Sequence, residues 1–141
     1  MRTISVPLTL INLQDDGFHL LVEIVVFGKK SFAVLDTGAS RSVFDMTLIR
    51  TNISELEYSD ETHATTLFAT SSTIQATIPK LKIGRLVIEN YDTVALDLET
   101  VNQAYEQMGH PKVMGIIGSD ILLKYFATVN YRKLRLFLYA D

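Results

Sequence analysis

Apolar and polar residues alternate through the first third of the chain in the manner of half-buried β-strands. Leucines recur on one face of residues 8–13, and an Asp-Asp-Gly turn signal follows at residues 15–17. The apolar run HLLVEIVVFG, residues 19–28, predicts a long strand, and after a short turn the segment FAVLD, residues 32–36, predicts another. Two successive β-hairpins are therefore expected to lead directly to Asp36.

The next part of the chain has a less regular pattern. Residues 42–52, SVFDMTLIRTN, mix strand-like and helix-like spacing, and we predict a short helix there. Residues 53–63, ISELEYSDETH, carry four acidic side chains. Because charge runs are usually exposed, we predict a solvated loop or helix face for this segment.

A second β-rich region follows. Residues 65–78, TTLFATSSTIQATI, are rich in Thr, Ile and Phe and predict a β-hairpin with its tip near residues 69–72. Residues 81–98 predict further strands, broken at Gly84 and near Asn90.

One clear helix is predicted after these strands. Thr100 can cap its N-terminus and Gln103 can reach back in a capping box, while Gly109 ends it. Its apolar face is formed by Val101, Ala104, Tyr105 and Met108.

The C-terminal part predicts a short buried strand within VMGIIGSD, residues 113–120, then a helix over residues 120–126 and two strands over residues 126–139. The last segment, LRLFLY, would leave an apolar edge if unpaired and is a candidate strand of a dimer sheet. The pattern as a whole predicts one mostly β domain over residues 1–141, with two or three short helices and a closed sheet or barrel.

Composition and charge narrow the class of protein. Apolar residues make up 48% and charged residues 21%, which is ordinary for a globular domain, and there is no cysteine for disulfides or thiolate chemistry. The net charge is −3 and the basic residues are scattered, so we expect no nucleic-acid partner. No signal peptide or membrane-span pattern is found, and a cytoplasmic protein without a membrane partner is expected.

Asp36 is the residue whose chemistry needs explaining. An ionised carboxylate is costly to desolvate, yet this one ends an apolar strand and is followed at once by Thr37 and Gly38. It is either an ordinary turn residue or a reactive acid supported by the strand. A second element, GIIGSDIL at residues 115–122, lies far downstream and opens a helix.

Together, LDTGAS and IIGSDIL resemble the retropepsin-like aspartic proteases, single-lobe relatives of pepsin that act as homodimers. The resemblance extends over residues 4–139, and residues 95–131 look particularly like bacterial members of that group. It implies a single-lobe closed barrel with a flap hairpin, a second copy of the chain as partner, a peptide or protein substrate, and neither a cofactor nor a metal.

The same resemblance implies a mechanism in which two chains each supply Asp36. At about 3 Å and an effective dielectric near 20, two carboxylate charges repel by about 5 kcal/mol, so the pair holds one proton. The ionised member takes a proton from water while the protonated member gives one to the peptide carbonyl. A homodimeric aspartic endopeptidase is the leading interpretation.

Roles for the neighbouring residues are implied in the same way. Thr37 would hydrogen-bond to the other chain, Gly38 would allow a tight turn close to substrate, and the loop is completed by Ala39 and Ser40. The loop would be backed by Ile116, Ile117 and Gly118.

The match is imperfect at two places. Flaps in this family usually carry glycine near the tip, whereas the flap candidate here has none; it comprises Phe68, Ala69, Thr70 and Ser71. Retroviral members often have Arg after the second glycine, where this chain has Ser119.

Other interpretations stay open from the sequence. The fold could serve as a dimerisation or peptide-binding module with little or no turnover, or the chain could be an unrelated β-barrel in which Asp36 faces solvent alone. His19, His63 and His110 lie far apart without ligand spacing, so no metal site is expected. Surface or helix-capping positions are expected for Asp45, Asp92 and Asp97.

Overall fold

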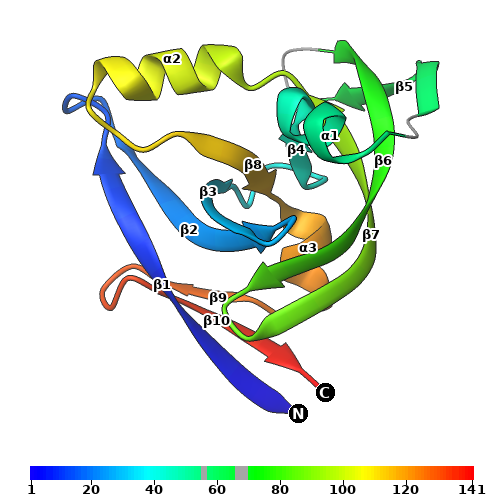
Figure 1. Cartoon of the computed structure of the whole chain (residues 1–141). Helices are drawn as coiled ribbons and strands as arrows, with labels where there is room; N and C mark the ends of the chain where they lie inside the picture. Colours follow the sequence, from blue (N-terminus) through cyan, green and yellow to red (C-terminus); the bar gives the residue numbers. More distant parts are fainter. Residues whose placement is uncertain (55–56, 66–69) are drawn as a thin grey trace.

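The structure is a computed structural model that describes residues 1–54, 57–65 and 70–141, with side chains described outside residues 55–73. Within these ranges the strands are β1 (Arg2–Asn12), β2 (Phe18–Val26), β3 (Lys29–Leu35), β4 (Val43–Asp45), β5 (Glu57–Thr65), β6 (Thr70–Ile83), β7 (Leu86–Leu96), β8 (Val113–Ile117), β9 (Thr128–Asn130) and β10 (Arg135–Ala140). The helices are α1 (Met46–Asn52), α2 (Glu99–Gln107) and α3 (Ser119–Lys124) (Figure 1).

The strands close into a barrel. Neighbouring strands follow the order β6-β7-β4-β8-β3-β2, and the pairing of β2 with β6 through Ile24↔Ile83 closes the circle. Most pairs are antiparallel, but β3 pairs with β8, and β4 with β7, in parallel. The predicted mostly β, closed-barrel fold with a few short helices is confirmed.

A small sheet extends from the barrel. The second half of β1 pairs with β2, while its first half pairs with β10 from Arg2↔Ala140 to Pro7↔Arg135, and β10 pairs in turn with β9. The two chain ends therefore lie side by side (Figure 1).

Alternation along β2 and β3 divides the core into two clusters. Leu20, Val22 and Leu35 belong to the main cluster inside the barrel. Leu21 and Val34 point to the opposite face, because successive side chains of a strand alternate. There they form the α2-side cluster, which comprises Ile11, Leu21, Val34, Tyr105 and Val113. Figure 1 shows α2 lying beside β2 and β8 at this face.

Two predicted elements need correction. Residues 42–52 begin as strand β4, because fully buried Phe44 packs on Gly115, where an added Cβ would lie 2.9 Å from the ring. The helix starts only at Met46, with Asp45 as its N-cap. From residue 57 onward the acidic segment is strand and not loop or helix, since β5 occupies residues 57–65 at one edge of the sheet. Exposure of charges is typical of edge strands as well as loops.

The strand through Asn90 is continuous, although its pairing with β6 is irregular there. Asn90 has φ 51°, and the register passes from Ile78↔Tyr91 to Lys80↔Glu89 without a pair between them. The residue of β6 at this point is Pro79, which has no N–H to donate. A local distortion of β7 therefore replaces the predicted break.

The start of α2 also differs from the prediction. The helix begins at Glu99 with Leu98 as N-cap and no side-chain cap, so the capping box of Thr100 and Gln103 does not form. Asp97 instead accepts the Glu99 amide at 2.9 Å, and Asp45 accepts the Leu98 amide at 3.1 Å. Val101, Tyr105 and Met108 do face the core, whereas Ala104 is exposed.

The C-terminal strand has no free apolar edge. β10 pairs with β1 on one side and with β9 on the other, and the Tyr139 amide donates to the Tyr125 carbonyl at 2.8 Å. Leu136 and Leu138 are fully buried in the main core. The apolar edge on which the dimer-sheet prediction for LRLFLY depended is thus paired within the chain along residues 135–137, and a part for β10 in a dimer stays a prediction.

Candidate active site

Asp36 is the first residue after β3, and its backbone and side chain define a tight turn. Its amide donates to the Ile117 carbonyl at 3.0 Å, and its carbonyl accepts the Ala39 amide at 3.1 Å. The side-chain Oδ1 accepts the Gly38 amide at 2.9 Å. A Cβ at Gly38 would lie 3.3 Å from that same oxygen, so glycine gives the carboxylate room. The side chain remains exposed, with one oxygen oriented by the turn.

The end of β8 supports this loop from behind, as the resemblance implies for Ile116, Ile117 and Gly118. Ile117 is fully buried in the main core and Ile116 packs on the α2-side cluster. A Cβ at Gly118 would lie 2.7 Å from the Ala39 carbonyl oxygen, so only glycine fits without displacement of the loop. The close approach allows the Ser119 amide to donate to that carbonyl at 2.8 Å.

Ser119 contributes a second contact, since its hydroxyl donates to the Ser40 carbonyl at 3.3 Å. Ser119 therefore binds the loop of its own chain through neutral hydrogen bonds at the position where retroviral relatives often carry arginine. The loop residues Thr37 and Ser40 have exposed side chains, while Ala39 is half-buried.

A polar network that the sequence did not reveal lies directly behind the loop. Asp120 Oδ1 accepts the Ser42 amide at 2.8 Å and the Ser42 hydroxyl at 2.7 Å, and its Oδ2 accepts the Tyr91 hydroxyl. The Ser42 hydroxyl oxygen in turn accepts the Gly118 amide at 2.8 Å. Burial, followed by the hydrogen bond to Asp120 and its negative charge, raises the pKa of Tyr91. The network joins β7 and α3 to the segment that follows the Asp36 loop.

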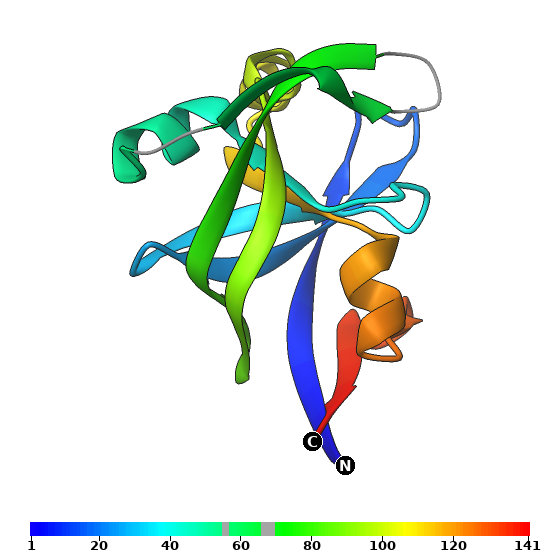
Figure 2. The same ribbon diagram turned by 90° about the vertical axis from the view of Figure 1, so that its right-hand side faces the viewer.

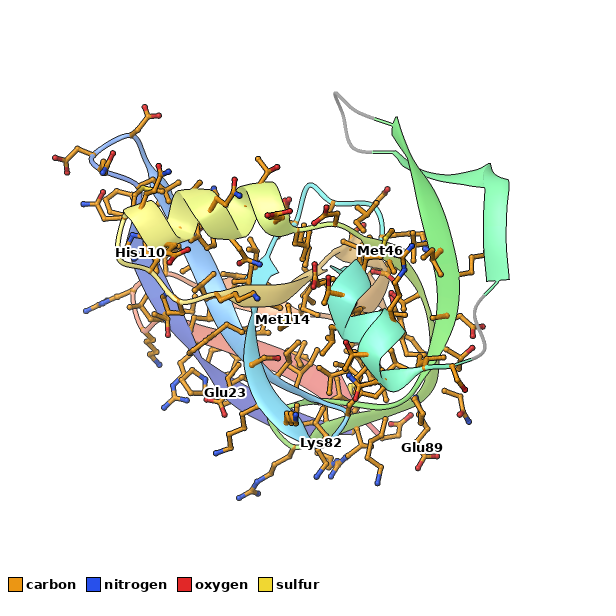
Figure 3. The ribbon with its side chains drawn as sticks, turned by 45° about the horizontal axis from the view of Figure 1, so that its top comes forward. Glu23, Met46, Lys82, Glu89, His110 and Met114 are labelled. Carbon is orange, nitrogen blue, oxygen red and sulfur yellow. The ribbon has the colours of Figure 1, made fainter. Side chains whose placement is uncertain are left out.

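Two histidines flank a buried tyrosine on the α2 side. The Tyr105 hydroxyl oxygen lies 2.6 Å from His19 Nδ1, and the centroids of the two rings are 5.9 Å apart. The His110 ring lies 6.3 Å from the Tyr105 ring, and its Nε2 donates to the Asn12 carbonyl at 2.6 Å, beside the β1–β2 turn (Figure 3). Burial, and after it the negative charge of Asp36, raises the pKa of Tyr105. The Asp36 carboxylate is thus within electrostatic reach of this group.

The hairpin formed by β5 and β6 lies on the same side of the molecule as the Asp36 loop (Figure 2). Its last described pair is Thr65↔Thr70. Of the flap candidate, Thr70 and Ser71 begin β6 and pair with β5, whereas Phe68 and Ala69 lie outside the described residues. The predicted hairpin is present with longer arms than expected, but residues 70–72, which the sequence placed at its tip, are already paired with β5.

Within the described ranges, no group of three or more His, Asp or Glu side chains is arranged to hold a metal ion. No helix in those ranges is both long and apolar enough to cross a membrane. A groove of about 780 Å³ is lined by residues of α1 and α2, including Thr47 and Gln103, and does not include Asp36.

This chain is similar to known proteins both in its fold and in its sequence family. A solved structure of a retropepsin-like aspartic protease from Rickettsia conorii aligns with a TM-score of 0.59 at 15% identity, covering 97% of this chain and 89% of that one. No curated protein sequence matched. The sequence profile of the aspartyl protease family matches residues 22–121, which include Asp36, the hairpin and the whole IIGSDI element. The fold is retropepsin-like, and the chain belongs to the aspartyl protease family.

Proposed function

We propose that the protein is a homodimeric aspartic endopeptidase in which Asp36 from each of two chains forms the catalytic dyad. The observation that carries the proposal is the exposed Asp36 carboxylate, oriented by the Gly38 amide on a loop that β8 and α3 support closely. The chain has one Asp-Thr-Gly sequence, which is half of such a site. The family match argues against an unrelated barrel with a solitary Asp36.

In the proposed reaction, the ionised Asp36 takes a proton from water as the water oxygen attacks the peptide carbonyl carbon. The other Asp36 gives its proton to the carbonyl oxygen, producing a tetrahedral gem-diol. The C–N bond then breaks as the first carboxyl returns a proton to the leaving nitrogen, and the second removes a proton from a gem-diol hydroxyl. The dyad is thereby restored with one shared proton.

The surroundings of Asp36 support a peptide as substrate. The carboxylate is exposed, and the β5–β6 hairpin extends on the same side of the molecule (Figure 2). In the dimer, two exposed loops centred on Asp36 would meet at the two-fold axis. Thr37, which is exposed on this loop, would form its hydrogen bond to the second chain there.

The proposal is tested by solution mass and by cleavage of a randomised peptide library. We expect a dimer at micromolar concentration, cleavage by the wild-type protein, and no cleavage by Asp36→Asn with an unchanged circular dichroism spectrum. A strictly monomeric protein, or cleavage retained by Asp36→Asn, would refute the proposal.

A dimerisation or peptide-binding module is the second candidate. The sequence from β5 to β6 contains no glycine, which favours a hairpin less able to bend over a substrate. A dimer that captures peptides and releases them uncut would establish this candidate.

A further inference from the structure

The register of the barrel brings His19 next to Asp36. Leu20 pairs with Leu35 at the last recorded step of the β2–β3 ladder, so one further step places His19 opposite Asp36. Two members of the α2-side cluster are near them in sequence. Leu21 lies two residues after His19, and Val34 lies two residues before Asp36. Side chains two apart on a strand share a face, so this alternation, extended one residue past the end of β3, directs both His19 and Asp36 toward the face of the α2-side cluster.

Tyr105 orients the His19 ring. The tyrosine is 3% exposed, and within the described residues His19 Nδ1 is the hydrogen-bond partner found for its hydroxyl, at 2.6 Å. The buried Tyr105 O–H has no other acceptor among the described residues, so it donates to Nδ1 of a neutral His19 ring. The ring proton then lies on Nε2, and a protonated ring also carries a proton there. His19 Nε2 is therefore a hydrogen-bond donor in both forms.

The electrostatic influence of Asp36 on Tyr105 agrees with this placement. The negative charge of Asp36 raises the pKa of the tyrosine, which requires the carboxylate and the hydroxyl to be near each other. His19 bonds that hydroxyl and is itself exposed, as Asp36 is. The exposed carboxylate is thus accompanied on its α2 side by an exposed, oriented N–H donor.

We propose that His19 is a substrate-binding residue next to Asp36, selecting peptides whose side chain adjacent to the scissile bond carries a hydrogen-bond-accepting oxygen, and that Tyr105 is its positioning residue. This inference rests on the proposed function, because a scissile bond exists only if the protein cleaves peptides; the binding of the peptide beside Asp36 can be tested separately. The preferred side chains are those of Asp, Glu, Asn and Gln.

The selectivity depends on whether the Nε2–H donor of His19 keeps a hydrogen-bond partner when a peptide binds. An accepting oxygen satisfies Nε2–H when the bound peptide covers it, whereas an aliphatic side chain at the same place removes water and leaves the donor unpaired. A net hydrogen bond of ordinary strength corresponds to a preference of about threefold to tenfold for the accepting side chain over an aliphatic one of similar size.

The experiment uses the full-length protein in the Asp36→Asn background, so that it does not require catalysis. A randomised peptide library is captured on this protein and on versions that also carry His19→Leu, His19→Gln or Tyr105→Phe, and the bound peptides are sequenced by mass spectrometry. His110→Gln is the matched control, because its imidazole also flanks Tyr105 but donates to the Asn12 carbonyl. The same library is cleaved by the proteins with Asp36 intact, and KM and kcat are measured for the best sequence.

We expect Asp36→Asn to capture peptides enriched at one position in accepting side chains. His19→Leu should abolish the enrichment, His19→Gln should keep part of it through its amide N–H, and Tyr105→Phe should weaken it by a few-fold, acting on KM more than on kcat. The His110→Gln control should leave it unchanged. An enrichment that survives His19→Leu, or the capture of no peptide at all, would overturn the inference. Capture with the expected enrichment but without cleavage would refute only the proposed function.

Discussion

Replacement of Asp120 by Ala tests the network behind the active-site loop most directly. The substitution removes the acceptor of three hydrogen bonds, two from Ser42 and one from Tyr91. Ser42 is fully buried, so water cannot readily replace the carboxylate as the acceptor of its amide. Tyr91 is half-buried. Of the three donors, the Ser42 hydroxyl keeps one hydrogen bond because its oxygen accepts the Gly118 amide, whereas the Ser42 amide and the Tyr91 hydroxyl would be left unpaired.

The magnitude follows from those two donors. An unpaired buried donor costs about 1–3 kcal/mol, so we expect the free energy of unfolding to fall by about 3–5 kcal/mol for Asp120→Ala. For a chain of this size this corresponds to a decrease in Tm on the order of 10 °C. Asp120→Asn keeps an acceptor for Ser42 and should lose only about 1 kcal/mol.

The assay is urea unfolding followed by circular dichroism, with all variants at one protein concentration because dimerisation adds to apparent stability. Asp92→Ala is a matched control, since among the described residues its carboxylate accepts a single exposed side-chain hydroxyl, that of Thr77 at 2.7 Å. It should change the free energy of unfolding by less than about 0.5 kcal/mol. If Asp120→Ala were no less stable than Asp92→Ala, the network would not hold the loop in place and the reasoning would be refuted.

Four further predictions concern other parts of the molecule. Gly118→Ala should lower the free energy of unfolding by about 1–3 kcal/mol in urea titrations, because its Cβ would meet the Ala39 carbonyl; unchanged stability would contradict the close packing. Tyr91 has a raised pKa, so the stability linked to its protonated form is complete below about pH 10 and is lost as pH rises above it. The free energy of unfolding should therefore fall less steeply above pH 10 in Tyr91→Phe than in the wild type, and equal slopes would contradict this. Asp36→Asn should lower the pKa of Tyr105 in an NMR titration assigned with Tyr105→Phe, because a negative charge is removed, and an unchanged value would place Asp36 farther away. Deletion of residues 134–141 should unfold the chain by circular dichroism, because Leu136 and Leu138 are fully buried, whereas a folded product would show that β10 is dispensable.

Sequence patterns correctly predicted those helices and strands that depend on residues only a few positions apart in the chain. The alternation leading into residues 32–36, the apolar face of α2 and the glycine-bounded strand before Ser119 each depend on residues a few positions apart, and each is present. Residues 57–65 were misassigned because a run of acidic residues is compatible with an edge strand as well as with a loop. The capping box of α2 failed because a residue from another element, Asp45, takes an amide at the start of the helix.

The polar contacts of the site were beyond sequence reasoning for a different reason. Asp120 lies in the first turn of α3, where carboxylates are common, and its position two residues after Gly118 gave no sign that Ser42 and Tyr91 would donate to it. His19 and Tyr105 are separated by 86 positions, and only the barrel closure and the insertion of α2 bring them together. Such pairs follow from tertiary packing, for which one sequence carries no direct signal.

The supports of the Asp36 loop have a consequence for the order in which the protein folds. The loop is held by partners from residues 117–119, about eighty positions later in the chain, and β1 is paired with β10 from the opposite end of the sequence. Contacts of such high sequence separation form slowly, because the loop-closure entropy is spent before the contacts can compensate for it. During synthesis, the turn at Asp36 therefore emerges long before its supports. A nascent or partly folded chain contains the acid without the geometry that orients it, and the site is completed only as the barrel closes.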